Sequence, residues 1–495
     1  MILFILLFLS IVLTFVMSWI GFVLDKRRSN VPGPMPLPII GNGHKFLVHR
    51  TKFLEVLSKY SKEYNCAFTV YILNRRYVAL NHPKYIEPIV SSAELIVKGR
   101  SYEILKAWLG TGLLTSSGNK WKSHRKFLTP AFHFNILQSF LPVFTKNEKV
   151  LINKLKGLAG TTIDLFPIIA LAALDNVTES IMGVSFHAQN NDESDYVKAV
   201  DDISRVLALK MRNPFLMVEQ IYNLLPHKTR QDKALDILHL ETKKVIAARR
   251  RELENFNKTQ VLQSSEIGIK NKHAFLDLLL LAEIDGQRLD DETIREEVDT
   301  FMFEGHDTTT SGIVFTLYCI SLHKEVQEKI LNEQQTIFGE DLERDPTYNE
   351  LQQMKYLELV IKESLRLYPP VPIIERHMAN DTEAAGLKLL KGTAILINFF
   401  EMQRNPDVFE DPLEFRPERF EKPLNNPYNW LAFSAGPRNC IGQRFAMMEM
   451  KVTISAIVKN FKIEASDVVP KLCADLILRA DNGVFVKFVR RESKL

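Results

Sequence analysis

The chain has 495 residues, of which 46% are hydrophobic and 25% charged, and its formal net charge is +4. This balance is typical of a folded globular protein and is too mild to indicate a nucleic-acid binder. The four cysteines, Cys66, Cys319, Cys440 and Cys473, are far apart and form no C-x-x-C pair. The spacing excludes a disulfide framework and a structural zinc site, and reducing surroundings fit it best.

The first 24 residues, Met1 to Leu24, carry no charged side chain. A helix of this length spans about 36 Å, enough to cross a hydrocarbon core of about 30 Å. The run is too long for a cleaved signal peptide, and no alanine among the first thirty residues provides a cleavage site. Lys26, Arg27 and Arg28 follow, so the positive-inside rule predicts a retained anchor in the endoplasmic reticulum, with the rest of the chain in the cytosol.

A basic and proline-rich segment, residues 25–38, comes next. Its four alternating prolines favour extended backbone and a stiff connection. We therefore divide the chain into an anchor over residues 1–24, a hinge over residues 25–38 and one large domain over residues 39–495.

The large domain reads as mainly α with a small β region. Residues 66–81 predict two strands around the turn Asn74-Arg75-Arg76, and residues 388–397 predict a hairpin. Residues 136–256 read as successive amphipathic helices, and the polar stretch 262–272 as a linker.

A long helix is predicted to begin at the N-cap Asp290 and to end near His323, over about 45–50 Å. Its centre, residues 303–312, is rich in glycine and hydroxyl side chains, which are poor choices inside a helix. Hydroxyl groups that bond back to helix carbonyls can bend a helix and open a groove. The pattern indicates that something must fit against the middle of this helix.

The second unusual stretch is the loop over residues 433–442, which delivers Cys440 to the start of an apolar helix. Backbone N–H groups and a helix dipole there are expected to favour the thiolate, which is a nucleophile or a soft metal ligand. Gly436 and Gly442 allow a flat ligand to approach the backbone. The alternative is a cysteine that serves only as a small buried hydrophobe.

The pattern F-x-x-G-x-R-x-C-x-G in this loop resembles the haem-binding loop of the cytochrome P-450 superfamily of monooxygenases. The resemblance implies the P-450 fold, a haem b cofactor and Cys440 as the axial iron ligand. It also implies a set of cofactor-binding residues, namely Trp121, Arg125, Arg376, Phe433, Arg438 and Gly442.

Two further patterns carry the same resemblance. Gly305-x-Asp307-Thr308-Thr309 resembles the oxygen-binding motif, in which Thr308 would hold the reacting oxygen and Asp307 would supply protons from solvent. The E-x-x-R pair Glu363 and Arg366, with Arg419 as its third member, would form a structural network for folding and haem retention.

The residue before this motif, Glu304, departs from most of the superfamily. The stretch 297–309 looks instead like the fourth P-450 family, whose members include fatty-acid ω-hydroxylases. In that family the glutamate is esterified to a haem methyl group, so an ester through Glu304 is implied here. The alternative is a protonated or paired Glu304 with no bond to the cofactor, because a free charge beside the haem would be costly.

The function implied is a membrane-anchored haem-thiolate monooxygenase that inserts one oxygen atom from O₂ into an apolar substrate. Fatty acids, related lipids, hormones and foreign lipophiles all fit, with ω-hydroxylation of acyl chains favoured. No nucleotide fingerprint follows a strand, so NADPH should bind a separate NADPH–cytochrome reductase, with cytochrome b5 as a second possible partner. A P-450-fold isomerase or dehydratase and a non-catalytic haem-binding or sensor protein are the alternatives.

Overall fold

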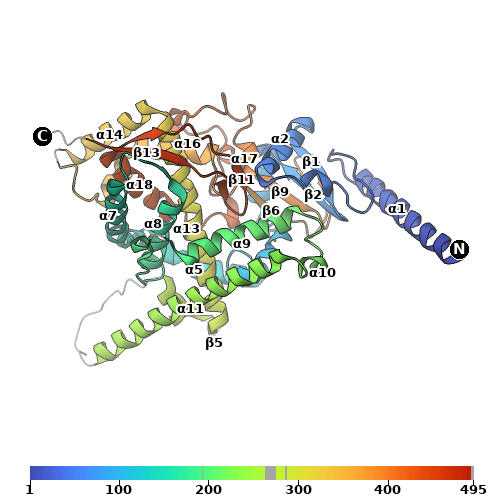
Figure 1. Ribbon diagram of the computed structural model, residues 1–495, viewed down its shortest axis with the longest axis horizontal. Coiled ribbons are helices and arrows are strands. Elements are labelled where there is room, and N and C mark those ends of the chain that lie inside the picture. The colour runs from blue at the N-terminus through green and yellow to red at the C-terminus, as the bar shows by residue number, and fades with distance from the viewer. Residues whose placement is uncertain (192, 262–274, 285–286, 340, 492–495) are drawn as a thin grey trace.

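The computed structural model describes residues 1–191, 193–261, 275–284, 287–339 and 341–491. The predicted linker over residues 262–272 lies outside the described residues. The chain is mainly helical with small sheets, which confirms the predicted fold class (Figure 1).

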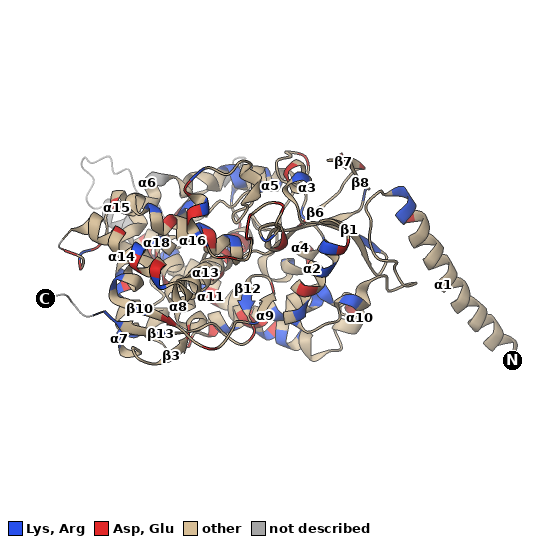
Figure 2. Cartoon of the chain, turned by 90° about the horizontal axis from the view of Figure 1, so that it is seen from above, with Lys and Arg blue, Asp and Glu red and all other residues tan. Residues whose placement is uncertain are grey.

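The N-terminal helix α1 (Ile2–Arg28) projects from one end of the domain (Figure 1). Among the described residues it is the one helix that is long and apolar enough to cross a membrane. Figure 2 shows it free of charged side chains until its domain end. The helix continues through Arg28, so the first four residues that the sequence assigned to the hinge are helical.

The helices of the domain form most of its core. The first half of the chain contains α2 (Phe53–Glu63), α3 (Pro83–Val90), α4 (Ser101–Leu109), α5 (Gly118–Leu128), α6 (Phe134–Leu137), α7 (Leu141–Gly157), α8 (Leu165–Ser180), α9 (Asp195–Arg212), α10 (Glu219–Tyr222) and α11 (Pro226–Val261). The second half contains α12 (Phe275–Leu281), α13 (Asp291–Leu322), α14 (Lys324–Phe338), α15 (Tyr348–Gln353), α16 (Lys355–Leu367), α17 (Phe399–Met402) and α18 (Gln443–Asn460).

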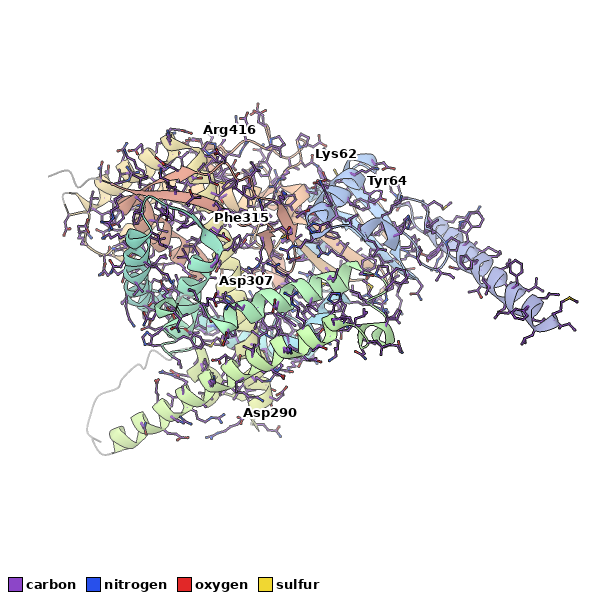
Figure 3. All side chains as sticks on the ribbon, viewed as in Figure 1. Lys62, Tyr64, Asp290, Asp307, Phe315 and Arg416 are labelled. Atoms are coloured by element: carbon purple, nitrogen blue, oxygen red, sulfur yellow. The ribbon has the colours of Figure 1, made fainter. Side chains whose placement is uncertain are left out.

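The long helix α13 runs through the middle of the domain and packs against α8, α11, α16 and α18. Its 32 residues span about 48 Å. The predicted N-cap is confirmed, because Asp290 Oδ1 accepts a hydrogen bond of 2.7 Å from the Thr293 N–H. Figure 3 shows Asp307 and Phe315 of this helix inside the domain, and both are buried.

The main sheet has the order β1-β2-β9-β6, built from β1 (Ala67–Ile72), β2 (Arg75–Leu80), β9 (Ala394–Asn398) and β6 (Ile373–His377). The predicted hairpin β1–β2 is present, but its turn is tighter than expected, because Ile72 already pairs with Arg75. Leu73, with a φ of 53°, makes the turn. Arg75 and Arg76 therefore belong to a strand.

The predicted hairpin over residues 388–397 is wrong. Its first part lies in β8 (Leu387–Leu389), which pairs with β7 (Thr382–Ala384), whereas its second part is β9 in the main sheet. The other strands of the domain are β3 (Thr162–Asp164), β10 (Phe461–Ala465) and β13 (Phe485–Arg490) in one sheet, with the short pairs β4 (Glu283–Ile284) and β5 (Gln287–Arg288), and β11 (Leu472–Ala474) and β12 (Leu478–Ala480).

Candidate active site

A cavity of about 380 Å³ brings the two unusual stretches of the sequence together. Its wall includes Glu304, Gly305 and Thr308 from the middle of α13, together with Cys440 and Gly442 from the loop before α18. The predicted site residues that line this cavity are Trp121, Arg125, Glu304, Thr308, Arg376, Phe433, Arg438, Cys440 and Gly442. Asp307, Glu363, Arg366 and Arg419 do not line it.

The loop that carries Cys440 is held by close backbone contacts. Gly436 has a φ of 66°, and a Cβ there would lie 2.0 Å from the Val90 carbonyl oxygen, so only glycine fits. The Cys440 N–H donates to the Phe433 carbonyl at 3.0 Å. At Gly442, by contrast, the only neighbour of an added Cβ would be the Cys440 sulfur at 3.9 Å. Gly442 therefore leaves open space beside the sulfur, as a flat ligand requires.

The Cys440 sulfur is exposed to the cavity, while the rest of its surroundings are protein. Burial raises the pKa of the thiol to about 12, and the charge of Glu304 adds to this, whereas the Gly442 N–H and Arg125 lower the pKa less. The first helical residue after the loop is Gln443. A bound metal ion would supply the missing stabilisation of the thiolate.

The metal, if one binds, must bring most of its ligands with it. No three His, Cys, Asp or Glu side chains gather as a metal site among the described residues. Haem iron would meet this condition, because the porphyrin supplies most of the ligands and the protein need add only a sulfur. The single cysteine and the open space beside it therefore fit haem.

Five cationic side chains line the same cavity. Arg212 pairs with Asp475 at 3.5 Å, which leaves four: Lys98, Arg125, Arg376 and Arg438. None of the four has an ion pair with a carboxylate among the described residues. Burial, then the charge of Arg376, lowers the pKa of Arg438 to about 9 and places that of Lys98 well below its usual range. An anionic group in the cavity would relieve this repulsion, and the two propionates of haem fit that requirement.

Fixed contacts hold two of these cations, Arg438 and Arg125, in place. Arg438 donates to the Ser116 carbonyl at 2.6 Å, and its guanidinium lies 4.0 Å from the centre of a Trp121 ring. Arg125 donates to the carbonyl and side-chain oxygens of Asn439 at 2.8 and 2.7 Å. The arginines are thus positioned by carbonyl groups, so their charge stays available to the cavity.

Lys98 is a site residue that the sequence reasoning missed. It forms an isolated β-bridge with Arg376 and lines the cavity. A single lysine in a loop carries no periodic or motif signal. Its position becomes visible only when β6 brings Arg376 beside it.

The hydroxyl groups at the centre of α13 bond back to the helix. Thr308 Oγ1 donates to the Glu304 carbonyl at 2.7 Å, and Thr309 Oγ1 donates to the Gly305 carbonyl at 2.8 Å. The helix nevertheless continues without a break from Asp291 to Leu322. A Cβ at Gly305 would lie 2.4 Å from Val177 Cγ2, so this glycine permits the close packing of α13 on α8.

Glu304 places its carboxyl group at the cavity wall with no hydrogen bond to it from any described residue. Burial raises its pKa to about 7, the charge of Lys98 lowers it, and Glu297 raises it further. Glu304 is therefore a carboxyl group whose protonation state can change near neutral pH.

Asp307 faces away from the cavity, on the other side of α13. It is buried, and one oxygen pairs with Arg479 Nη2 at 2.5 Å while the other oxygen has no partner among the described residues. Arg479 also contacts Asp201, 3.5 Å away and partly exposed. These contacts lead from the middle of α13 toward the surface.

The three residues assigned to a structural network meet in the core. Glu363 accepts from Arg366 Nε at 2.7 Å and Nη2 at 2.8 Å, and from Arg419 Nε at 2.9 Å. The Arg416 N–H donates to the same carboxylate at 2.9 Å. Arg366 Nη1 also donates to the carbonyls of Gln403 and Pro412. The network thus joins α16 to the segment that leads to the Cys440 loop.

A second residue that the sequence reasoning missed is Glu449, on α18. It is fully buried, accepts a hydrogen bond of 2.9 Å from Asn176 Nδ2, and its pKa is raised to about 8 by burial. It also lies within hydrogen-bonding reach of the Thr309 side chain. An apolar helix pattern gave no reason to single out its one acidic residue.

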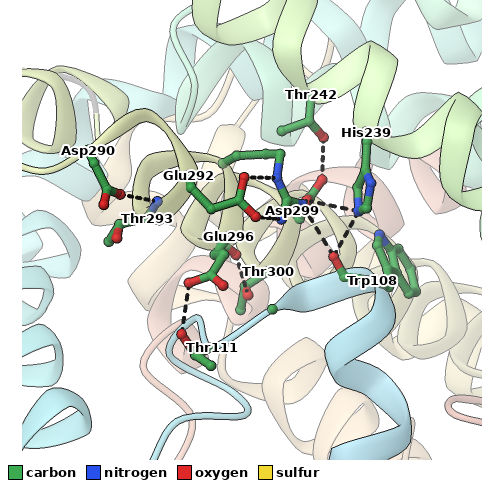
Figure 4. A network of polar contacts seen from close by, with 12 residues as sticks. Trp108, Thr111, His239, Thr242, Asp290, Glu292, Thr293, Glu296, Asp299 and Thr300 are labelled. Carbon is green, nitrogen blue, oxygen red and sulfur yellow. Dashed lines mark hydrogen bonds and ion pairs between the residues drawn. The ribbon is translucent and has the colours of Figure 1, made fainter.

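Polar contacts around the first half of α13 tie this helix to its neighbours (Figure 4). Asp299 accepts from Thr242 Oγ1 of α11 at 2.5 Å and from Arg295, and it lies 3.6 Å from His239 Nε2. Thr111 Oγ1, just after α4, donates to Glu296 at 2.9 Å. Burial raises the pKa of Asp299 to about 7 despite these partners.

Comparisons with known proteins agree with this geometry. Residues 31–488 match the family model described as cytochrome P-450. The chain is 42% identical to "Cytochrome P-450 4d2" of Drosophila melanogaster over 473 residues, which covers 93% of this chain and 94% of that protein. It is 40% identical to "Cytochrome P-450 4V2" of Homo sapiens over 467 residues, which covers 92% of this chain and 89% of that protein.

Proposed function

The chain belongs to the cytochrome P-450 family and is a P-450 monooxygenase, and on this premise we propose that it hydroxylates the terminal carbon of fatty acids or related lipids. One observation carries the proposal. The cavity that contains Cys440 and Glu304 continues along apolar side chains from α2 and β1, among them Phe53, Leu57 and Val70. An acyl chain fits such a lining, and the two relatives described above bear names of the fourth family.

The residues around the cavity would hold haem, which when bound supplies the iron at which molecular oxygen is activated. Cys440 would hold the iron through its sulfur. Lys98, Arg125, Arg376 and Arg438 would bind the propionates through charge-assisted hydrogen bonds. Trp121 would keep the Arg438 guanidinium in place, and Phe433 would shield the sulfur from water.

Thr308 would position a proton at the cavity, and Asp307 would transfer protons toward it. The Thr308 hydroxyl hydrogen is donated to the Glu304 carbonyl, so the lone pairs of Oγ1 are free to accept a hydrogen bond from a protonated group in the cavity. Asp307, in contact with Arg479 and through it with the partly exposed Asp201, would pass protons inward. The expected role of Thr308 is thus to hold a proton at its Oγ1 side, with no part in holding the iron.

We also propose that Glu304 is esterified to the haem through its carboxylate oxygen. The support is that the carboxyl group lines the cavity, has no hydrogen bond from a described residue and resists ionisation. An ester would remove the charge and attach the cofactor to α13. Turnover itself would supply the oxidation that this bond requires.

The proposed location is the endoplasmic reticulum membrane, with the domain in the cytosol. The support is α1, which ends in Lys26, Arg27 and Arg28. The segment around α10, at the same end of the molecule as α1 in Figure 1, also exposes Phe215, Ile221 and Leu224. Electrons would come from NADPH–cytochrome reductase, with cytochrome b5 as a further donor.

Product identification tests the proposed activity. Membranes that contain the full chain, reductase and NADPH are given medium and long fatty acids, isoprenoid hormones and foreign lipophiles, and the products are identified by mass spectrometry. We expect terminal hydroxylation of the fatty acids. The Cys440→Ser variant should make no product and should lack the thiolate signature in its reduced carbon monoxide spectrum. Hydroxylation confined to the other substrate classes would exclude the proposed specificity.

A further inference from the structure

A second cavity of about 490 Å³ lies at the joint between α1 and the main sheet. The last turns of α1 contribute Ser18, Gly21, Phe22 and Asp25 to its wall, and the β1–β2 hairpin contributes residues between Tyr71 and Tyr77. Three more distant segments contribute Arg100, His377 and residues of the stretch from Lys391 to Ala394. Only Tyr77 also lines the active-site cavity. We call this second cavity the joint cavity.

Specific contacts fix the end of α1 against the sheet. Phe22 is buried, and the centre of its ring lies 5.0 Å from that of Tyr71. The Tyr71 hydroxyl donates to Asp25 at 2.9 Å, and Arg76 Nε donates to the same oxygen at 2.8 Å. Pro32, just beyond the helix, accepts a 2.7 Å hydrogen bond at its carbonyl from the Thr69 N–H. Specific side-chain and backbone contacts therefore hold the walls of the joint cavity together.

The joint cavity is strongly positive. The only carboxylate on its wall, Asp25, is already paired with Arg76. Arg75, Arg100 and Lys391 form no ion pair within the described part of the chain, although buried Glu375 on β6 offsets part of the charge of Arg75. Three cationic side chains thus line one cavity without forming an ion pair with a carboxylate of the described residues.

His377 adds a further hydrogen-bond donor to this wall. Burial, and then the charge of Arg100, lowers the pKa of His377. A neutral imidazole can donate one hydrogen bond to an anion while the three cations supply the charge. The wall therefore has the composition of a phosphate site, in which arginine forks and a lysine surround one anion.

The height of the joint cavity relative to a membrane identifies the source of the phosphate. A hydrocarbon core of about 30 Å takes up about 20 helical residues. Counted from Ile2, this length ends at Gly21, so the next turn, from Phe22 to Asp25, lies at the level of the lipid headgroups. Anionic phospholipids of the cytoplasmic leaflet present their phosphates at this level.

We propose that the joint cavity binds the headgroup of one anionic glycerophospholipid. Arg75, Arg100 and Lys391 contact its phosphate, and its acyl chains run along the apolar surface of α1. A soluble phosphate ester shares the chemistry of the headgroup but has no acyl chains to lie against the helix. The proposal rests on the membrane anchoring proposed above.

Lipid retention by the purified protein tests this proposal. The full-length holoenzyme in neutral detergent is stripped of lipid, incubated with an equal mixture of dioleoylphosphatidylserine and dioleoylphosphatidylcholine, repurified, and analysed for lipid per haem. We expect about one phosphatidylserine per chain and little phosphatidylcholine. The double variant Arg100→Gln/Lys391→Gln should retain at least about tenfold less phosphatidylserine, because each cation near such a headgroup contributes substantially.

The matched control, Lys355→Gln/Lys422→Gln, also removes two exposed cations, but these lysines line neither cavity. This variant should retain phosphatidylserine like the wild type. Equal loss in both variants would show diffuse charge attraction, and equal retention of phosphatidylcholine would show that the net charge of the headgroup is not recognised. Either result overturns the proposal. Complete displacement of phosphatidylserine by millimolar inorganic phosphate would also overturn it, in favour of a soluble phosphate site.

A folding defect is separable from loss of the site. Haem per chain reports folding, and the charge-conserving variant Arg100→Lys/Lys391→Arg should retain phosphatidylserine even if the double Gln variant loses haem. If the charge-conserving variant keeps its haem but retains no more phosphatidylserine than phosphatidylcholine, the site is not a cationic headgroup site. Because the assay uses detergent, its failure is also distinct from a failure of membrane anchoring, which is measured by deleting residues 1–24 and fractionating the membranes.

Discussion

Two glutamates inside the domain, the buried Glu363 on α16 and the half-buried Glu304 on α13, have opposite environments. The Glu363 carboxylate receives three hydrogen bonds from two arginines and one from a backbone N–H. The Glu304 carboxyl group faces the cavity and receives none from the described residues, and burial raises its pKa to about 7. The protein supplies a full set of hydrogen-bond donors to Glu363, whereas it leaves the Glu304 carboxyl group free to interact with a ligand.

The difference separates the parts of the molecule that hold the fold from those that meet the cofactor. A buried charge with a full set of donors is tolerated but must keep all of them. A buried carboxyl group without donors prefers its neutral form and can react or change protonation at little structural cost. Changes around Glu363 should therefore affect folding, and changes around Glu304 should affect chemistry.

The largest effect is expected from Glu363→Ala. Removing the carboxylate leaves Arg366 and Arg419 with uncompensated charge, which costs about 3–5 kcal/mol for such a buried pair. This is a large share of the ~5–15 kcal/mol by which a domain is stable. We expect little protein with bound haem, measured as haem per chain and by thermal unfolding.

A control on the same helix is Glu358→Ala, because Glu358 forms partly exposed pairs with Lys362 and Lys451. Its haem content should stay near that of the wild type. Normal haem content in Glu363→Ala would show that the saturated carboxylate is not needed for folding.

The next largest effect is expected from Thr308→Ala, on the Glu304 side of the comparison. The variant should fold and bind haem, because Thr308 hydrogen-bonds only to its own helix. Loss of a group that positions a proton should lower product formed per NADPH at least about tenfold and divert the reducing equivalents into hydrogen peroxide. Product, NADPH and peroxide are measured together, and wild-type coupling would remove Thr308 from the mechanism.

A smaller effect is expected from Glu304→Ala. Its haem content should be normal, but acid and organic solvent should extract all of its haem, whereas wild-type protein should keep a haem-bearing fraction after turnover. Absorbance of the protein fraction after extraction measures this. Complete extraction from wild-type protein after many turnovers would show that the ester is absent.

The smallest effect concerns Asp299, an intermediate case with two hydrogen-bond donors but a pKa raised from 3.8 to about 7 by burial. Between these values the folded protein binds a proton that the unfolded chain does not. The free energy of unfolding should therefore fall as the pH rises from about 4 to about 7. Asp299→Asn should flatten this slope in urea unfolding, and an unchanged slope would contradict the assignment.

Local patterns were good guides where a few adjacent residues determine the structure. The Asp290 cap and the meeting of two distant motifs at one cavity could be anticipated, since spacing places side chains on one helix face or at one loop. Lys98 and the partners of β8 and β9 could not, because they depend on which segments become neighbours.

The order of strands in the main sheet has a consequence for how the chain is made. β2 pairs with β9, and Leu80 lies opposite Ile397. About 300 residues must be synthesised between them, which takes about 15–60 s at the usual ~5–20 residues per second. During that interval the edge of β2 that pairs with β9 has no partner strand, and such an edge recruits other strands. The newly made protein therefore passes through a period in which something other than β9 must cover this edge.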